Sequence, residues 1–321
     1  MKLSVLTVPL YAYTLEETLE YLHGLGVQQV ELGCGGFPGK THLDPDIYLN
    51  NPEKIAEVKA LLKKYDMEIS ALSAHGNAVH PNKEIAATAK KDFENAVLLA
   101  EQLGVETVVT FSGCPGDSET SQYPNWVVCP WPDDFLTILD YQWNKVLIPY
   151  WQEEVKFVRA HGVKHVAFEM HPGFCVYNPE TCLKLRNAVG PELGANFDPS
   201  HLIWQGMDPV AAIKELKGAI FHFHAKDTRI DKYNTAKNGV LDTKHYADIP
   251  ERSWVFRTVG YGNGEQYWKD MVTALKTVGY DGALSIEHED SLMSVKEGLE
   301  KAIAMVKNVM IEETAGEMWW A

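Results

Sequence analysis

The chain has 321 residues, of which 45% are hydrophobic and 23% charged, as expected for a globular enzyme. Its formal net charge is −15, from 44 acidic and 29 basic residues, which disfavours nucleic acid and anionic membranes as partners. Five scattered cysteines form no CxxC pair and indicate reduced thiols in a cytoplasmic protein. There is no apolar run of about eighteen residues, so no membrane span is expected.

Predicted strands alternate with predicted helices along the whole chain. The strands are expected at residues 3–8, 27–32, 67–73, 106–111, 164–170, 194–198, 218–224 and 282–287. Thr14 and Glu17 have the spacing of a capping box that opens the first helix, and Pro52 is suited to the first position of another. This alternation implies parallel strands joined by crossover helices. Without a glycine-rich nucleotide fingerprint, eight such units predict an α/β fold of the closed (β/α)8 TIM-barrel type.

No linker divides the chain, so residues 1–312 are expected to form a single barrel domain. Two aromatic-rich stretches, 112–132 and 228–264, interrupt the alternation and are predicted to be long irregular loops that serve as lids or partner surfaces. Trp126, in the first stretch, is a candidate for packing against a sugar ring. The tail, 313–321, ends in GEMWWA, and its tryptophans are expected to dock on the barrel or on a partner subunit.

The last four predicted strands end in a similar way. In TIM barrels the catalytic groups lie at the C-terminal ends of the strands. Because side chains alternate along a strand, each of these ends has one acid or histidine as its last inward residue. These residues are Glu169, Asp198, His224 and Glu287. The alternate positions are expected to face the helices, and they include Phe221 and Phe223. Such a donor set suits Mn²⁺, Mg²⁺, Co²⁺ or Zn²⁺.

Together with the motifs DPSH and HAKDTR, these strand ends resemble the xylose-isomerase-like TIM-barrel family of sugar phosphate isomerases and epimerases. That family also includes endonuclease IV, and inosose dehydratases and C-glycoside deglycosidase subunits resemble it. The resemblance implies one divalent metal ion, with Mn²⁺ expected first, bound by the four residues above. It also implies that His201 and Arg229 contact substrate. The implied chemistry is proton abstraction beside the carbonyl of a keto-sugar through a metal-bound enediolate, with Glu169 and Glu287 exchanging protons.

The chain departs from the family's ketose 3-epimerases, which usually have a second glutamate where this chain has Cys175. His171, two residues after Glu169, offers a different acid or base. His75 and Asn77 follow the third strand and are candidates for a general base and a substrate contact, and Lys226 is a candidate to hold a substrate oxygen. The fourth strand ends without a histidine, which together with the acidic charge disfavours a DNA-repair role.

Three functions remain open at this point. The first is an isomerase or epimerase of a keto-sugar or 3-keto-glycoside. The second is a lyase that eliminates a β-substituent from the same substrates, as in 3-keto-glycoside cleavage or inosose dehydration. The third is a metal-binding subunit that needs a partner chain. A homo-oligomer is expected. Glu31 either reaches the site or anchors the barrel, and His222 is expected to be a hydrogen-bonded core histidine.

Overall fold

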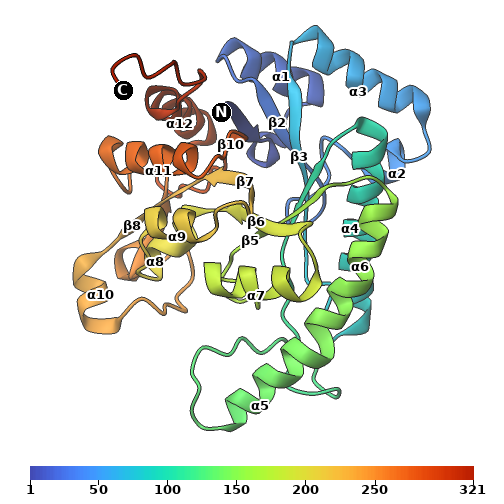
Figure 1. Ribbon diagram of the computed structural model, residues 1–321, viewed down its shortest axis with the longest axis vertical. Coiled ribbons are helices and arrows are strands. Elements are labelled where there is room, and N and C mark those ends of the chain that lie inside the picture. Colours follow the sequence, from blue (N-terminus) through green and yellow to red (C-terminus); the bar gives the residue numbers. More distant parts are fainter.

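A computed structural model describes residues 1–321, and its eight parallel strands close into a barrel (Figure 1). The order around the barrel is β1-β10-β7-β6-β5-β4-β3-β2. The strands are β1 (Lys2–Leu6), β2 (Gln29–Gly36), β3 (Glu68–His75), β4 (Thr107–Thr110), β5 (His165–Glu169), β6 (Leu193–Phe197), β7 (Ile220–Ala225) and β10 (Ala283–Ile286). The predicted TIM barrel is therefore confirmed, with small differences at the strand ends.

Helices pack around the outside of the barrel (Figure 1). They are α1 (Leu15–Gly24), α2 (Pro45–Tyr48), α3 (Pro52–Lys64), α4 (Lys83–Leu103), α5 (Asp134–Asp140), α6 (Ile148–Ala160), α7 (Pro179–Val189), α8 (Pro199–Trp204), α9 (Pro209–Glu215), α11 (Glu265–Thr277) and α12 (Val295–Val309). The predicted capping box opens α1, where the Thr14 hydroxyl accepts from the Glu17 backbone N–H at 3.2 Å. A π-helical turn, Tyr141–Leu147, joins α5 to α6. None of the helices is both long and apolar enough to cross a membrane.

The apolar core lies between the strands and the helices, where 64 buried residues form one cluster. Inside the barrel the apolar cluster is small and consists of Ala71, Val109 and Ala167. Phe221 packs against this inner cluster and stacks on His165, so its predicted placement on the helix-facing side is wrong. The pairing of β6 with β7 shifts register next to Ala195, which breaks the simple alternation at this point. Buried polar side chains also lie inside the barrel, and they include Glu31, His222 and Ser285.

The stretch 228–264 is not the irregular loop that was predicted. The strands β8 (Asp227–Ile230) and β9 (Trp254–Arg257) form an antiparallel pair, and α10 (Lys232–Asn238) lies between them. Asp227 holds the base of this insertion, because its carboxylate accepts from the backbone N–H groups of Gly260, Gly262 and Asn263 at 2.9–3.1 Å. We call residues 227–264 the hairpin insertion. A buried carboxylate with several backbone donors fixes where the returning chain lies.

The C-terminal tail is the second place where the structure differs from the prediction. After α12 the tail contains no helix or strand, and Trp319 and Trp320 are 87% and 68% exposed. The two rings contact each other edge to face, with centroids 5.7 Å apart. The predicted docking of these rings on the barrel is therefore not seen. The stretch 112–132 contains neither helix nor strand.

Candidate metal centre

Glu169, Asp198, His224 and Glu287 converge at the C-terminal end of the barrel, and we call them the ligand cluster. One ligand atom from each residue lies within 4.8 Å of the corresponding atoms of the other three. His224 Nδ1 lies 3.0 Å from Glu287 Oε2 and 3.5 Å from Glu169 Oε2. The neighbouring strands β7 and β10 place His224 opposite Ser285, so Glu287 follows directly beside the imidazole. The structure thus brings together the four side chains that the strand ends singled out.

The DPSH motif explains how Asp198 is aimed. Asp198 is the N-cap of α8, and its Oδ1 accepts from the Ser200 backbone N–H at 2.8 Å. Its other oxygen, Oδ2, has no hydrogen-bond partner and is buried. Three residues further on, in the same helix, His201 Nε2 lies 3.4 Å from Asp198 Oδ2. One short helix therefore delivers both a ligand-type carboxylate and an imidazole to the same end of the barrel.

Glu169 is surrounded by imidazoles, and we call this group the imidazole side. His75 Nε2 lies 3.0 Å from Glu169 Oε2, and His201 Nε2 lies 3.0 Å from Glu169 Oε1. The His171 ring lies against the His201 ring with centroids 4.0 Å apart, and its Nδ1 donates to the Pro172 carbonyl at 2.5 Å. Phe111 packs edge-on against both His75 and His171. The imidazole side is therefore a compact, aromatic-walled group around one carboxylate.

Glu287 has a different neighbour, the buried ammonium of Lys226, and we call this group the lysine side. Lys226 Nζ lies 2.9 Å from Glu287 Oε2 and 3.2 Å from Asp198 Oδ2, and it donates to Glu289 Oε2 at 3.2 Å. The ammonium also lies 4.7 Å from the centre of the Phe256 ring, which β9 of the hairpin insertion supplies. Lys226 is thus a fixed positive charge beside the ligand cluster.

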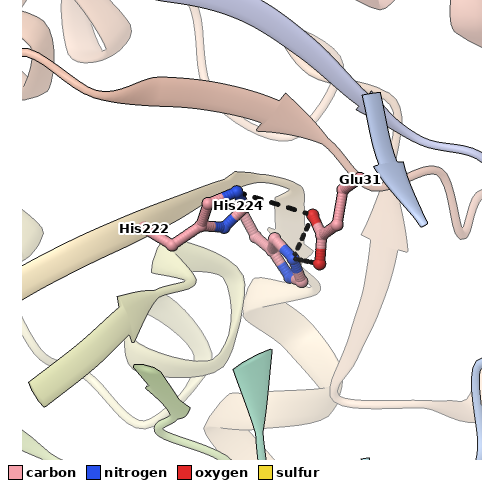
Figure 2. Close-up of side chains that lie close together, drawn as sticks. All are labelled: Glu31, His222 and His224. Carbon is pink, nitrogen blue, oxygen red and sulfur yellow. Dashed lines mark hydrogen bonds and ion pairs between the residues drawn. The ribbon is translucent and has the colours of Figure 1, made fainter. Parts of the chain in front are cut away.

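A third group lies beneath the ligand cluster and is formed by Glu31, His222 and His224 (Figure 2). His224 Nε2 lies 3.0 Å from both oxygens of Glu31. The hydroxyls of Ser73 and Ser285 donate to the same carboxylate, Ser285 at 2.7 Å. His222 Nδ1 lies 3.0 Å from Asn196 Oδ1, so its expected role as a hydrogen-bonded core histidine agrees with its surroundings.

Burial and neighbouring charges set the ionisation of the carboxylates. Burial alone would raise the pKa of Glu169, but the hydrogen bonds from His201, His224 and His75 bring it well below its usual range. Burial likewise opposes ionisation of Glu287, and the charge of Lys226 lowers the pKa of Glu287 to about 2. Burial raises the pKa of Asp198 to about 7 in spite of Lys226. The cluster therefore concentrates negative charge, and a bound cation would offset that charge.

The imidazoles separate into two classes. Burial lowers the pKa of His201 to about 3 and that of His222 to about 4, and it also lowers the pKa of His171. Burial acts on His224 in the same direction, but the charges of Glu31 and Glu287 raise the pKa of His224 well above its usual value. Burial would also lower the pKa of Lys226, and the charges of Asp198, Glu287 and Glu289 raise it instead. The neutral rings of His171 and His201 therefore lie on one side of the cluster, and the Lys226 ammonium lies on the other.

The ligand cluster fits a divalent cation. Asp198 Oδ2, His224 Nδ1 and Glu287 Oε2 are all buried and lack a well-aligned hydrogen bond, although Lys226 lies near two of them. Buried polar atoms without partners are uncommon, and three around one point indicate a site built for another ligand. Three carboxylates and an imidazole are donors that Mn²⁺, Mg²⁺, Co²⁺ and Zn²⁺ accept.

The other residues singled out from the sequence lie in different places. Asn77 uses both ends of its amide on the backbone of Cys114, donating at 2.8 Å and accepting at 3.0 Å. Trp126 packs edge-on against Tyr177, and its indole Nε1 has no partner. Arg229 lies on β8 with an exposed side chain, outside the ligand cluster. His75, His171, His201 and Lys226, by contrast, lie beside the cluster.

Sequence reasoning missed two neighbours of Lys226, namely Glu289 and Phe256. Glu289 could have been found, because it follows Glu287 at a spacing of two and period-two alternation then places both on one face. Phe256 carried no such signal, since its strand β9 is only four residues long and pairs within the hairpin insertion. Glu31 was left undecided and proves to contact His224 directly.

Comparisons with known proteins agree with the barrel fold. A family model described as "Xylose isomerase-like TIM barrel" matches residues 19–309. The "Uncharacterized protein YfiH" of Bacillus subtilis (strain 168) is 39% identical over 97% of this chain and 99% of its own. An "Inosose dehydratase" of Clostridium perfringens is 25% identical over 87% of this chain and 86% of its own. The solved structure of "IOLI protein with a binding zinc atom" has a TM-score of 0.65 at 20% identity, covering 96% of each chain.

Proposed function

Because the chain belongs to the xylose isomerase-like TIM barrel family, we propose that it removes the proton next to the carbonyl of a keto-sugar or cyclic keto-polyol with the help of a divalent metal ion. The family and the relatives with named activities make the chain an enzyme of sugar metabolism. The observation that carries the proposal is the convergence of three carboxylates and one imidazole within 4.8 Å, with three ligand atoms left without hydrogen bonds.

In this proposal Glu169, Asp198, His224 and Glu287 hold the cation, with Mn²⁺ the first ion to test. When bound, the cation would polarise the carbonyl and stabilise the negative charge that develops on its oxygen. Glu169 takes the proton, because it lies among His75, His171 and His201, whose rings can hold substrate hydroxyls in place. Lys226 Nζ donates a hydrogen bond to a substrate oxygen from the opposite side. Phe111 and Phe256 limit the access of water.

We favour loss of water after proton removal, as in a dehydratase of a cyclic keto-polyol. The relative named inosose dehydratase covers most of this chain, which supports that outcome over others. The two sides of the ligand cluster also support it, because an elimination needs a base at one carbon and a donor near the departing hydroxyl at the next. Glu169 and the Lys226 ammonium are suited to these two tasks and lie on opposite sides of the cluster.

Epimerisation is the second candidate, and one observation favours it. Glu169 and Glu287 are both ligand-type carboxylates at the same centre, so either could remove a proton from one face and return it to the other. A pair of bases on opposite faces is what inversion at a carbon beside a carbonyl requires. Cys175, however, is buried where the family's ketose 3-epimerases have a further glutamate.

The test is incubation with Mn²⁺ and a panel of inososes, free ketoses and 3-keto-glycosides in D₂O. NMR reports deuterium uptake at the carbon beside the carbonyl, and mass spectrometry reports the product. Loss of the mass of water supports the dehydratase, whereas a product of unchanged mass supports the epimerase and loss of a sugar substituent supports glycoside cleavage. A folded, metal-loaded protein that neither exchanges deuterium nor forms product contradicts the proposal.

A further inference from the structure

We propose that Glu31 is a positioning residue for the metal centre, which fixes the protonation and the ring orientation of His224 so that Nδ1 faces the cation. The inference rests on the proposed function in so far as the ligand cluster binds a metal ion. It goes beyond that function, because Glu31 lies on β2 and none of the four ligand strands supplies it. Its chemistry is that of a carboxylate behind an imidazole ligand.

The contacts of Glu31 identify which nitrogen of His224 would keep its proton when a cation is bound. Both oxygens of Glu31 lie 3.0 Å from His224 Nε2, and the same oxygens accept from the hydroxyls of Ser73 and Ser285. Carboxylate oxygens accept hydrogen bonds, so Nε2 is the donor in this contact. The other nitrogen, Nδ1, lies 3.0 Å from Glu287 Oε2 and has no aligned partner. Nδ1 is therefore the nitrogen available to a cation.

The remaining contacts hold Glu31 in this orientation. Ser73 donates to one oxygen and Ser285 donates to the other at 2.7 Å, and the Glu31 side chain is fully buried. His222 Nε2 lies 3.8 Å from Glu31 Oε2, a longer contact than the two at 3.0 Å that His224 Nε2 makes (dashed lines in Figure 2). Serines on β3 and β10 thus fix the carboxylate from both sides. A carboxylate held in this way restricts the imidazole to one ring orientation.

A role limited to barrel stability would not single out His224. If the Glu31 carboxylate were only structural, the two serine hydroxyls and one further donor of any kind would satisfy its oxygens. Removing Glu31 would then lower stability without altering the protonation of His224. The geometry here is more specific, because a single N–H is shared by both carboxylate oxygens. The inference therefore makes a prediction about His224 itself, independent of turnover.

The experiment compares the wild type with Glu31→Leu and Glu31→Gln by two measurements. Competition with a chromophoric chelator gives the affinity for Mn²⁺ and Zn²⁺, and ¹⁵N-histidine NMR of the zinc-loaded protein reports which ring nitrogen of His224 carries the proton. Leucine removes the acceptor, so metal affinity should fall about 10- to 100-fold and the Nε2–H signal should change. Glutamine keeps one acceptor oxygen, so it should keep the Nε2–H signal and lose less affinity.

Glu154→Leu is the matched control, because Glu154 is also a buried carboxylate but lies on α6 and pairs with Lys90 at 2.6 Å. It should lower stability and leave metal affinity unchanged. Wild-type affinity together with an unchanged His224 signal in Glu31→Leu would overturn the inference. If Glu31→Leu does not fold, the test relies on Glu31→Gln. Loss of its Nε2–H signal at wild-type metal affinity would also overturn the inference. Failure of the wild type to bind metal would instead refute the proposed function.

Discussion

The imidazole side and the lysine side place the same functional group, a glutamate carboxylate, in two different surroundings. Glu169 has a side chain that is 4% exposed, and its oxygens lie 3.0 Å from the imidazole nitrogens of His75 and His201. Glu287 has a side chain that is 15% exposed and lies 2.9 Å from the permanent charge of Lys226. Two identical side chains in one cluster therefore need not have the same role, because the surroundings decide which proton each can move.

The comparison has a chemical consequence. Both glutamates are held ionised, and Glu169, whose contacts are imidazoles and not an ammonium, is the one suited to act as a base. A carboxylate beside an ammonium stays ionised, and it suits metal binding and the stabilisation of charge on substrate. On this basis we propose Glu169 as the base and Glu287 with Lys226 as the donor side. The predictions below test this assignment.

The largest effect is expected from Glu169→Gln. The amide keeps an oxygen for the cation but cannot accept a proton, so kcat/KM should fall on the order of 10³-fold. Deuterium exchange beside the carbonyl should be lost as well, and NMR in D₂O measures this directly. Asp198→Asn is the matched control, since it removes one charge from the same cluster without removing the base. At saturating metal it should still exchange. Equal loss of deuterium exchange in both variants would mean that the lost negative charge, and not the lost proton acceptor, lowers the activity of Glu169→Gln.

The next effect concerns stability and comes from Lys226→Met. In the metal-free protein this variant leaves Asp198, Glu287 and Glu289 without their ammonium, so the free energy of unfolding should fall by about 3 kcal/mol. Added Mn²⁺ should recover a large part of the loss, because the cation replaces the missing positive charge. Urea unfolding with and without metal measures both values.

Lys2→Met is the control for that measurement, because its pair with Glu68 is exposed on both sides and contributes about 0–1 kcal/mol. Metal should not alter its stability relative to the wild type. If metal-free Lys226→Met is as stable as the metal-free wild type, the Lys226 ammonium does not stabilise the lysine side.

The imidazole side and the lysine side also differ in how well the sequence predicted them. Strand ends are easy to locate, because period-two alternation and the strand–helix repeat are both regular, so Glu169, Asp198, His224 and Glu287 could be named in advance. His201 was named through the family resemblance of the DPSH motif, in which it follows Asp198 by three residues. On the lysine side Lys226 and Glu287 were also named, but Phe256 belongs to the hairpin insertion, whose short strand β9 has no regular pattern. Phe256 reaches Lys226 only through tertiary folding, which no local signal reports.

Two further failures have physical reasons. Phe221 was placed on the helix-facing side because strict alternation was assumed, whereas the register shift next to Ala195 turns it toward the interior. Glu31 stayed undecided because a glutamate inside a strand has no local signal that reveals its partner. His224 lies 193 residues further along the chain, so only closure of the barrel brings the two together.

A third, smaller effect separates elimination from epimerisation and comes from Glu287→Gln. If Glu287 belongs to the donor side of a dehydratase, exchange of the proton beside the carbonyl should persist while product formation falls about 10²-fold. If Glu287 is the second base of an epimerase, exchange should be lost from one epimer and kept for the other. NMR exchange with each epimer distinguishes these results. Loss of exchange from every substrate would contradict the division of roles between the two glutamates.

The smallest effects are expected from the side chains that surround the two carboxylates without holding the cation. His171→Ala opens the imidazole side, because the His171 ring packs at 4.0 Å against His201. Phe256→Leu opens the lysine side, where the ring lies 4.7 Å from Lys226 Nζ and 5.3 Å from the His201 ring. Each should raise KM up to about 10-fold, because losing one substrate or packing contact costs about 1 kcal/mol.

The two variants should differ in kcat. His171→Ala leaves Glu169 with its bonds from His75 and His201, so kcat should stay within about twofold to threefold, consistent with loss of binding alone. Phe256→Leu removes the aromatic face beneath the ammonium and lets Lys226 shift away from Glu287, so kcat should fall together with the rise in KM. Steady-state kinetics at saturating Mn²⁺ measures both. Equal losses of kcat in the two variants would mean that the imidazole side and the lysine side act as one unit. The different surroundings of Glu169 and Glu287 would then not explain the chemistry.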